Sequence, residues 1–483
     1  MIRTPEIDLV PILPELVLCA TAIVGLLYEA FARPSDRRVH VLVASIGLAG
    51  TAAVSVLLWN HEGTDTVLQG MVSVDRFSVL ARVLLVAIAA FALVYGTHYF
   101  ARSGDEARGE FYPLLLFATA GMTLITAAND LIVTFLALEI LSLSLYVLTG
   151  ITGRRGSSEA AMKYFLLGAF SSAFFLYGVA MAYGATGTTK IRGIANALTG
   201  TTGDLAIVLL AFAFLAVAFA FKVSSVPFHM WTPDVYQGAP TPVTAYMSAA
   251  TKVAAFMALI RVLDVAFQPI TWDWTPVVWV LAAASMIVGS VLAIAQSDVK
   301  RMLAYSSIAH AGFILTGLTA ADQTGIRAAL FYLIAYSIMT LGAFGIVMLV
   351  SARGEEQTSF ASYAGLARRS PLLAGLMTLF LLSLAGIPPT VGFIAKAGVF
   401  GAAIGAGYWP LALIGVASSV VAAFFYLRLI VLMYMQEPQG EHDRDPSLMP
   451  RVAIAIPAFL TLALGIFPGL LSDILREASV LRW

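Results

Sequence analysis

Apolar runs of about 20 residues, the length of one membrane crossing, fill most of this 483-residue chain. A window of about 19 residues places them near 9–31, 39–59, 74–99, 111–127, 130–150, 161–184, 205–230, 242–263, 275–296, 302–318, 326–350, 371–404, 407–435 and 450–472. Backbone groups in lipid must bond within their own segment, and the alternation of a membrane barrel is absent. The pattern therefore predicts an all-α polytopic membrane protein with about 14 transmembrane helices.

Two of these runs are too long or too interrupted for one straight helix. Run 205–230 continues past Lys222 to Pro227, and run 371–404 contains Gly386, Pro388 and Pro389. A straight helix through the second run, roughly 33 residues, would measure about 50 Å against a hydrocarbon core of about 30 Å. Each proline also lacks a backbone donor and clashes with the preceding turn. We therefore expect the seventh and twelfth helices to be broken inside the membrane.

Interrupted segments in matching positions are typical of transporters built from internal repeats. The two broken helices are five helices apart, and five is odd, so the second repeat would be inverted. This pattern predicts three N-terminal helices in 1–110, a first five-helix repeat in 111–270, a second in 271–436 and a last helix in 437–483.

The composition supports a membrane location and narrows the classes of function. Apolar residues make up 60% of the chain and charged residues only 12%. The net charge of zero gives no electrostatic reason to expect nucleic acid. The sequence has one cysteine, Cys19, so it has no four-cysteine set for an iron–sulfur cluster, and it has no GxGxxG dinucleotide motif. If the protein serves a redox machine, the electrons travel in other subunits.

Lysine and arginine gather in every second loop, and cytoplasmic loops carry the excess of these residues. The richer set is Arg33, Arg37, Arg38, Arg102, Arg108, Arg154, Arg155, Lys300, Arg301, Arg353, Arg368, Arg369, Arg444 and Arg451. The opposite set is Arg3, Arg76, Lys190, Arg192, Arg261, Arg327, Arg476 and Arg482. We expect a bacterial inner (plasma) membrane protein with both termini on the outer side.

Four ionisable residues lie deep within the apolar runs: Glu139, Lys222, Lys252 and Lys396. A lysine at the centre of a span costs about 2.5–3.5 kcal/mol on insertion, so each of these groups must face a partner or water. Glu139 follows the start of its run by nine or ten residues, about 15 Å of helix, which is the middle of the bilayer. Ser142 and Tyr146 continue its face at helical spacing.

These residues can form a proton relay. Burial disfavours the charged form of a lysine and a nearby carboxylate favours it, so moving the carboxylate switches the lysine between holding and releasing a proton. His229 and His310 could shuttle protons between such groups. Other interpretations stay open: a static Glu139–Lys222 ion pair that fixes packing, lysines that reach the membrane surface, and histidines that are hydrogen-bonded packing residues.

Four motifs carry a resemblance to a known family. The main one is KVSSVPFHMWTPDVYQGAPTPVTAYMS at 222–248, continuing to Lys252. The others are LEILSLSLYVL at 138–148, EAAMKYFLLGAFSS at 159–172 and DVKRMLAYSSIAHAG at 298–312. The chain resembles, over nearly its full length, the antiporter-like proton-conducting subunits of bacterial NADH-quinone oxidoreductase (complex I). It looks most like the subunit N members.

The resemblance implies fourteen helices, two inverted five-helix repeats and broken helices seven and twelve. It implies that Glu139 matches the essential glutamate of helix five, and that Lys222, Lys252 and Lys396 match the lysines of helices seven, eight and twelve. A lysine at 396 argues against subunit M, and the lack of a long C-terminal lateral helix argues against subunit L.

The function that we expect is proton translocation coupled to quinone reduction, with no redox centre in this chain. NADH, FMN, iron–sulfur clusters and quinone belong to other subunits in this interpretation, and the partners are membrane subunits equivalent to M and K. The main alternative is a subunit of a multisubunit cation/proton antiporter, which shares the fold and the lysines. A third interpretation is a structural spacer whose buried charges are inert.

Overall fold

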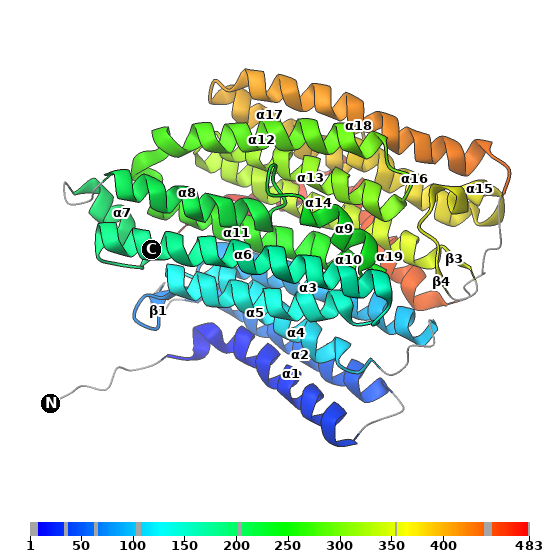
Figure 1. The fold of residues 1–483 in the computed structure, drawn as a ribbon, viewed down its shortest axis with the longest axis horizontal. Helices are drawn as coiled ribbons and strands as arrows, with labels where there is room; N and C mark the ends of the chain where they lie inside the picture. The colour runs from blue at the N-terminus through cyan, green and yellow to red at the C-terminus, as the bar shows by residue number, and fades with distance from the viewer. Residues whose placement is uncertain are drawn as a thin grey trace.

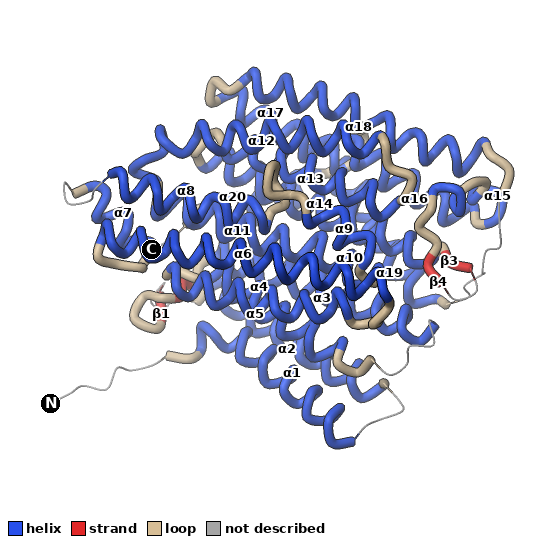
Figure 2. Tube along the Cα trace, in the orientation of Figure 1, coloured by secondary structure: helices blue, strands red, loops and turns tan. Residues whose placement is uncertain are grey.

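The computed structural model describes residues 8–32, 37–61, 66–102, 108–200, 205–352, 355–438 and 447–481. Within these ranges long helices run side by side in one bundle (Figure 1), and only two short hairpins interrupt the helical architecture (Figure 2). The helices are α1 (Leu13–Ala32), α2 (Arg38–Leu57), α3 (Arg76–Arg102), α4 (Phe111–Ala127), α5 (Leu131–Gly150), α6 (Arg155–Thr186), α7 (Ile191–Thr199), α8 (Leu205–Lys222), α9 (Trp231–Gly238), α10 (Thr241–Tyr246), α11 (Lys252–Arg261), α12 (Thr271–Ile294), α13 (Val299–Leu318), α14 (Gln323–Leu349), α15 (Leu366–Arg369), α16 (Pro371–Ala385), α17 (Val391–Gly405), α18 (Trp409–Met435), α19 (Leu448–Ile466) and α20 (Ser472–Ala478). The antiparallel hairpins pair β1 (Thr66–Val67) with β2 (Val72–Ser73) and β3 (Ser351–Ala352) with β4 (Glu355–Glu356).

The predicted all-α membrane fold is confirmed. Ten helical segments in the described ranges are long and apolar enough to cross a membrane, and α4, α16 and α17 are shorter apolar helices. Each apolar run predicted from the sequence overlaps at least one of the helices. The total of fourteen crossings and the pairing into inverted repeats stay predictions. Of the basic residues used for the orientation, Arg3, Arg33, Arg353, Arg444 and Arg482 lie outside the described residues.

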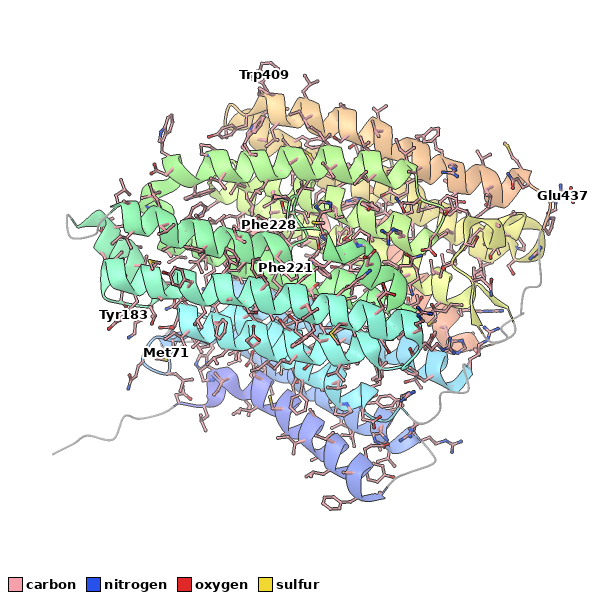
Figure 3. The ribbon with its side chains drawn as sticks, viewed as in Figure 1. Met71, Tyr183, Phe221, Phe228, Trp409 and Glu437 are labelled. Carbon is pink, nitrogen blue, oxygen red and sulfur yellow. The ribbon has the colours of Figure 1, made fainter. Side chains whose placement is uncertain are left out.

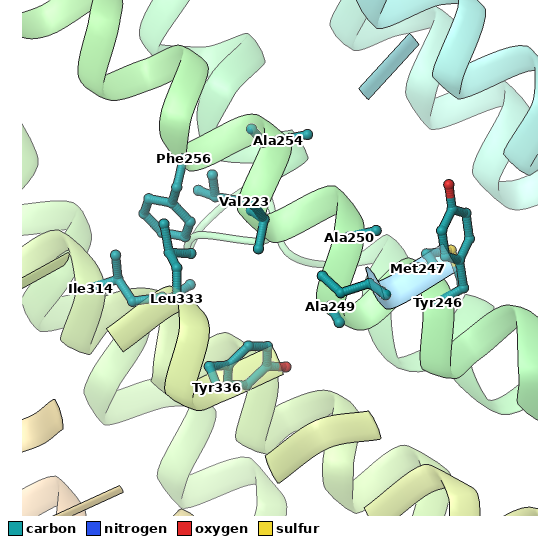
Figure 4. Packing of buried hydrophobic residues seen from close by; sticks show 14 of the residues in the cluster. Val223, Tyr246, Met247, Ala249, Ala250, Ala254, Phe256, Ile314, Leu333 and Tyr336 are labelled. Atoms are coloured by element: carbon teal, nitrogen blue, oxygen red, sulfur yellow. The ribbon is translucent and has the colours of Figure 1, made fainter. Parts of the chain in front are cut away.

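The centre of the bundle is formed by α10, α11, α13 and α14. Almost every residue of α13 and most residues of α14 are buried, whereas α1, α2 and α18 expose large apolar side chains on one face. In Figure 1, α1 and α2 form one edge of the bundle, and α17 and α18 form the opposite edge. Figure 4 shows the apolar packing at the centre, where Val223, Phe256, Ile314, Leu333 and Tyr336 come together from four segments.

Both predicted helix breaks are present. The helix α8 ends at Lys222 and α9 begins at Trp231, while α16 ends at Ala385 and α17 begins at Val391. Figure 3 labels Phe221, near the end of α8, and Phe228, within the first break, both near the middle of the bundle. The freed backbone groups find partners within the protein, as membrane burial requires. The indole of Trp231 donates to the carbonyl of Phe221 at 2.9 Å, for example.

The two ends of the bundle differ in charge. One end carries β3, β4 and α15, together with the described residues Arg37, Arg154 and Arg368, and we call it the basic end (Figure 1). The other end carries β1 and α7. At this second end Arg76 pairs with Glu477 at 3.0 Å, so the start of α3 and the helix α20 lie together.

Two ion pairs are buried near the starts of α1 and α3. The guanidinium of Arg82 contacts Glu15 at 2.9 Å, and that of Arg261 contacts Asp75 at 2.8 Å. Arg261 also donates to the carbonyl of Thr126 at 3.2 Å. Because these pairs join α1 to α3, and α3 to α4 and α11, they fix the N-terminal helices onto the rest of the bundle.

Glycines allow α12 and α13 to pack backbone against backbone. A Cβ atom at Gly289 would lie 2.6 Å from the amide nitrogen of Ala309. We expect Gly289→Ala to destabilise the protein by about 1–3 kcal/mol, because neither backbone can move away without disturbing the core. The measurement is thermal unfolding of purified protein in mild detergent. Gly401→Ala is the control, since nothing lies within 4 Å of a Cβ there; an equal effect of the two changes would contradict the explanation.

Candidate functional site

Glu139 lies on α5 and is half-buried. Its carboxylate accepts a hydrogen bond from the hydroxyl of Ser172 on α6. The polar face predicted for α5 is present, because Ser142, Tyr146 and Thr149 are all buried against neighbouring helices. Ser172 was not identified from the sequence, because a serine within a membrane helix gives no signal of which face it occupies.

Lys222 is the last residue of α8, at the first helix break, and only 4% of it is exposed. Its Nζ donates to the hydroxyl of Ser142 at 2.7 Å. The aromatic rings of Tyr146 and Tyr164 each lie 5.8 Å from the ammonium. Among the described residues no acidic side chain forms an ion pair with Lys222, although the charge of Glu139 acts on it from further away. A direct Glu139–Lys222 ion pair is therefore not part of this conformation.

Lys252 lies at the start of α11, directly after a π-helical turn at Met247–Thr251. It is 1% exposed, and its Nζ donates to the backbone carbonyl of Val223 at 2.9 Å. Val223 is the first residue after α8, so this lysine binds a carbonyl that the helix break leaves free. The ring of Tyr336 lies 5.8 Å from the same ammonium. The first two buried lysines are thus linked through the backbone, because Lys222 is followed directly by Val223, whose carbonyl binds Lys252.

Lys396 lies on α17, just after the second break, and makes the same kind of contact. Its Nζ donates to the carbonyl of Ala385, the last residue of α16, at 2.8 Å. The ring of Phe313 lies 4.7 Å from the ammonium. Only 5% of the lysine is exposed, so it does not reach the membrane surface. The three intramembrane lysines are therefore held inside the bundle, and the snorkelling interpretation is excluded for this conformation.

His310 occupies the space between Lys252 and Lys396. Its Nδ1 is 2.8 Å from the hydroxyl of Tyr332, and its Nε2 is 3.4 Å from the hydroxyl of Tyr426. Its ring also packs against Phe313, beneath Lys396, and against Tyr336, beneath Lys252. Both lysine charges act on this imidazole.

Hydroxyl groups extend this cluster. Tyr336 donates to Ser307 at 2.8 Å, and Ser306 is hydrogen-bonded to Tyr426. Each of these residues comes from α13, α14 or α18, so packing between distant helices creates the cluster. The tyrosines of this cluster were not identified from the sequence. Aromatic residues are common in membrane helices and carry no signal of their own.

His229 is not brought into this arrangement. It lies in the loop between α8 and α9 and is half-buried. Its Nδ1 has no hydrogen-bond partner among the described residues. Its role as a proton shuttle stays a prediction.

Lys300 is a further buried lysine, although the sequence pattern assigned it to a loop at the edge of an apolar run. Lys300, at the start of α13, is 1% exposed and donates to the carbonyl of Ala239 at 2.5 Å. It also contacts Glu356 of β4 at 3.2 Å. The same carboxylate accepts the amide of Thr241 at 2.8 Å. These contacts fix the junction of α9 and α10, which stands between Lys222 and Lys252 in the chain.

The site consists of titratable side chains held inside the bundle. Within the described ranges no group of three or more His, Cys, Asp or Glu side chains is placed to hold a metal ion. What the geometry provides is a series of titratable groups: Glu139, then Lys222, Lys252, His310 and Lys396. Hydroxyls, aromatic rings and free backbone carbonyls lie between them.

Comparison with known proteins identifies the family. The transmembrane family described as NADH:quinone oxidoreductase/Mrp antiporter matches residues 128–422, a range that contains all the titratable groups of the series. This chain belongs to that family. A protein named NADH-quinone oxidoreductase subunit N from Rhodococcus opacus is 45% identical over 526 residues, covering 99% of this chain and 97% of the relative. The resemblance to antiporter-like subunits, and to subunit N among them, is confirmed.

Solved structures of family members have the same fold. A chain of "Respiratory complex I from Thermus thermophilus with bound Aureothin" superimposes with a TM-score of 0.81 at 35% identity, covering 95% of this chain and 98% of that one. A chain of the Mrp complex from Dietzia sp. gives a TM-score of 0.85 at 24% identity, with 97% of each chain covered. At that identity the second likeness shows the fold alone.

Proposed function

We propose that this chain is the proton-translocating subunit N of a bacterial NADH-quinone oxidoreductase. The observation that carries the proposal is the burial of Lys222, Lys252 and Lys396 inside the bundle, each bonded to a hydroxyl or a backbone carbonyl. Static packing would be served at least as well by apolar side chains. Buried cations that can gain or lose a proton, placed along one interior path, are what proton transfer requires.

In the proposed mechanism, quinone reduction elsewhere in the complex changes the distance between Glu139 and Lys222. When the carboxylate is near, the ammonium form of Lys222 is favoured. When it moves away, Lys222 releases its proton toward Lys252. His310 and its tyrosines carry the proton on to Lys396, from which it leaves.

The proposed setting follows from this role. Subunits equivalent to M and K flank the chain in the plasma membrane, with both termini on the outer side and the basic end in the cytoplasm. NADH, FMN, iron–sulfur clusters and quinone are bound by other subunits, and this chain contributes no redox centre.

Copurification tests the proposal against its rival, a subunit of a multisubunit cation/proton antiporter, which the fold of the Dietzia Mrp chain also fits. For this test, the chain is expressed in its native host with an affinity tag, and the membranes are solubilised in mild detergent. We expect flavin and iron–sulfur proteins to copurify, together with NADH-driven quinone reduction. Recovery of antiporter subunits alone, with cation/proton exchange and no NADH oxidation, would establish the alternative.

Removing the hydroxyl that binds His310 should weaken proton transfer. We expect Tyr332→Phe to lower NADH-driven proton pumping by about three- to tenfold, the effect of losing one hydrogen bond in the path. Pumping is measured in inside-out membrane vesicles, with assembly checked on native gels. Tyr363→Phe is the matched control, because Tyr363 is also fully buried but its hydroxyl has no hydrogen-bond partner among the described residues. Equal losses in both variants would assign the effect to packing.

A further inference from the structure

The end of α8 holds a serine in a backbone conformation that serine rarely adopts. The amide of Ser225 donates to the carbonyl of Ala220 at 2.7 Å. The amide of Ser224 donates to the carbonyl of Phe221 at 3.1 Å, which completes a Schellman motif, a helix end with one residue in the left-handed region, usually glycine. Ser224 occupies that position, with a φ of 64°. Because the Cβ atom of a serine disfavours this conformation, it persists only where surrounding contacts hold it.

The contacts that hold the segment after Ser224 come from Ser285 of α12. The hydroxyl oxygen of Ser285 accepts a hydrogen bond from the amide of Val226 at 2.9 Å. It donates its own proton to the carbonyl of Leu281 at 2.6 Å, so the hydroxyl of Ser225, 2.8 Å away, must donate to it. A hydroxyl has one proton and two lone pairs, and all three are used here. Ser285 is fully buried, so these bonds are shielded from solvent.

The other end of the same short segment is held by Lys252. Val223 lies three residues before Val226, and its carbonyl accepts a hydrogen bond from the ammonium of Lys252 at 2.9 Å. Two helices, α11 and α12, therefore bind the break from two sides, one through a buried cation and one through a hydroxyl. A shift of Val226 away from Ser285 would move the carbonyl of Val223 as well, because two residues alone lie between them.

The second break is built in a similar way. There the ammonium of Lys396 binds the carbonyl of Ala385. The hydroxyl of Ser383 accepts a hydrogen bond from the amide of Gly392 at 3.2 Å. At both breaks, a lysine binds a carbonyl and a serine hydroxyl accepts an amide of the interrupted chain. Ser383 belongs to the broken helix itself, whereas Ser285 comes from a different helix, so at the first break a neighbouring helix fixes the backbone that the lysine binds.

We propose that Ser285 is a positioning residue for Lys252: its hydroxyl fixes the first break so that the carbonyl of Val223 faces the ammonium. The inference rests on the proposed function and adds a residue of α12 to it. Ser285 acts through the backbone of the break and carries no proton itself. Without this hydroxyl, the amide of Val226 loses its acceptor and the break can shift. The carbonyl of Val223 is then no longer fixed, and the protonated form of Lys252 loses its partner.

Hydrogen exchange at the break tests the contact directly. The backbone amides of residues 223–228 are followed by mass spectrometry in the protein purified with its partners in mild detergent. We expect about tenfold faster exchange in Ser285→Ala, the effect of one lost hydrogen bond, and no change in Ser290→Ala. Ser290 is the matched control, because it is also buried on α12 but its hydroxyl has no hydrogen-bond partner among the described residues. Equal exchange in the two variants would show that Ser285 does not hold the break.

A double-mutant cycle tests whether Ser285 acts through the contact of Lys252. Lys252→Met removes the cation that binds the carbonyl of Val223 and keeps an unbranched side chain in its place. If both contacts hold one segment, the effects of Lys252→Met and Ser285→Ala on exchange do not multiply in the double variant, because the first change has already released the segment. Effects that multiply would mean that the two residues act independently, and would overturn the positioning role.

Proton pumping shows whether the contact matters for transport. Ser285→Thr keeps a hydroxyl that can bond the carbonyl four residues earlier, and Ser285→Val has the same shape without the hydroxyl. Both variants add the same methyl group, so their difference reports the hydroxyl alone. We expect NADH-driven pumping in inside-out vesicles to be at least about threefold lower in Ser285→Val than in Ser285→Thr.

One further variant separates the two levels of the proposal. Lys222→Ala is measured in the same vesicles. If it stops pumping while Ser285→Val and Ser285→Thr pump equally, the positioning role is wrong and the proposed function stands. If Lys222→Ala pumps normally, the proposed function itself fails.

Discussion

A complex that carries Lys222→Ala should lose at least about tenfold of its NADH-driven proton pumping and coupled quinone reduction, because a group that carries the proton is missing. Oxidation of NADH by a soluble artificial acceptor should stay at the wild-type rate, since that reaction needs only the redox subunits. Lys190→Ala is the control, because Lys190 is exposed and its Nζ contacts only the carbonyl of Gln69 among the described residues.

Lys222→Arg distinguishes a proton carrier from a static charge. Arginine keeps its positive charge under all conditions in proteins. A carrier replaced by arginine cannot release its proton, so we expect pumping to fall nearly as far as in Lys222→Ala. Restoration of pumping by arginine would show that only a fixed charge is needed at this position. The static interpretation left open by the sequence would then be correct.

The largest effect on stability is expected at the buried pair of Arg261 and Asp75. Both side chains are almost fully buried, at 1% and 0% exposure. Arg261→Met leaves the carboxylate of Asp75 buried without its cation, which typically costs about 3–5 kcal/mol. We expect poor accumulation of the protein in membranes and a lower unfolding temperature of the purified complex.

Two comparison variants locate the cause of that loss. The double change Arg261→Met with Asp75→Asn removes both charges and should recover most of the stability. Arg76→Met breaks a pair with Glu477 whose side chains are 32% and 41% exposed, and should change stability by less than about 1 kcal/mol. If Arg261→Met were as mild as Arg76→Met, the buried pair would not hold α3 and α11 together.

The sequence predicted most strongly the features that cost free energy inside a membrane. Lys222, Lys252 and Lys396 stand out because a cation in an apolar run needs a partner, and the breaks stand out because proline cannot continue a helix. Both predictions depend on local composition alone. The structure confirms that the lysines are buried and that the two helices are interrupted.

The partners of those lysines could not be predicted, because they depend on which distant helices meet. Tyr332 and Tyr426 approach His310 from α14 and α18, and nothing in their own segments marks them. Lys300 lies at the end of an apolar run, which suggests solvent, yet β4 covers it from 56 residues further along the chain. The partners of Lys252 and Lys396 also could not be predicted, because they are backbone carbonyls and a pattern of side chains does not indicate which carbonyls are free.

Because Lys252 and Lys396 bind backbone carbonyls at the helix breaks, the conformation of each break depends on whether its lysine is protonated. An ammonium group donates a stronger hydrogen bond to a carbonyl than a neutral amine does. When Lys252 or Lys396 loses its proton, its hold on Val223 or Ala385 weakens, and the interrupted helix can shift. By thermodynamic reciprocity, a displacement of either interruption from outside must alter how tightly the lysine keeps its proton. In the proposed mechanism, a displacement of either interruption would in this way be converted into release of a proton.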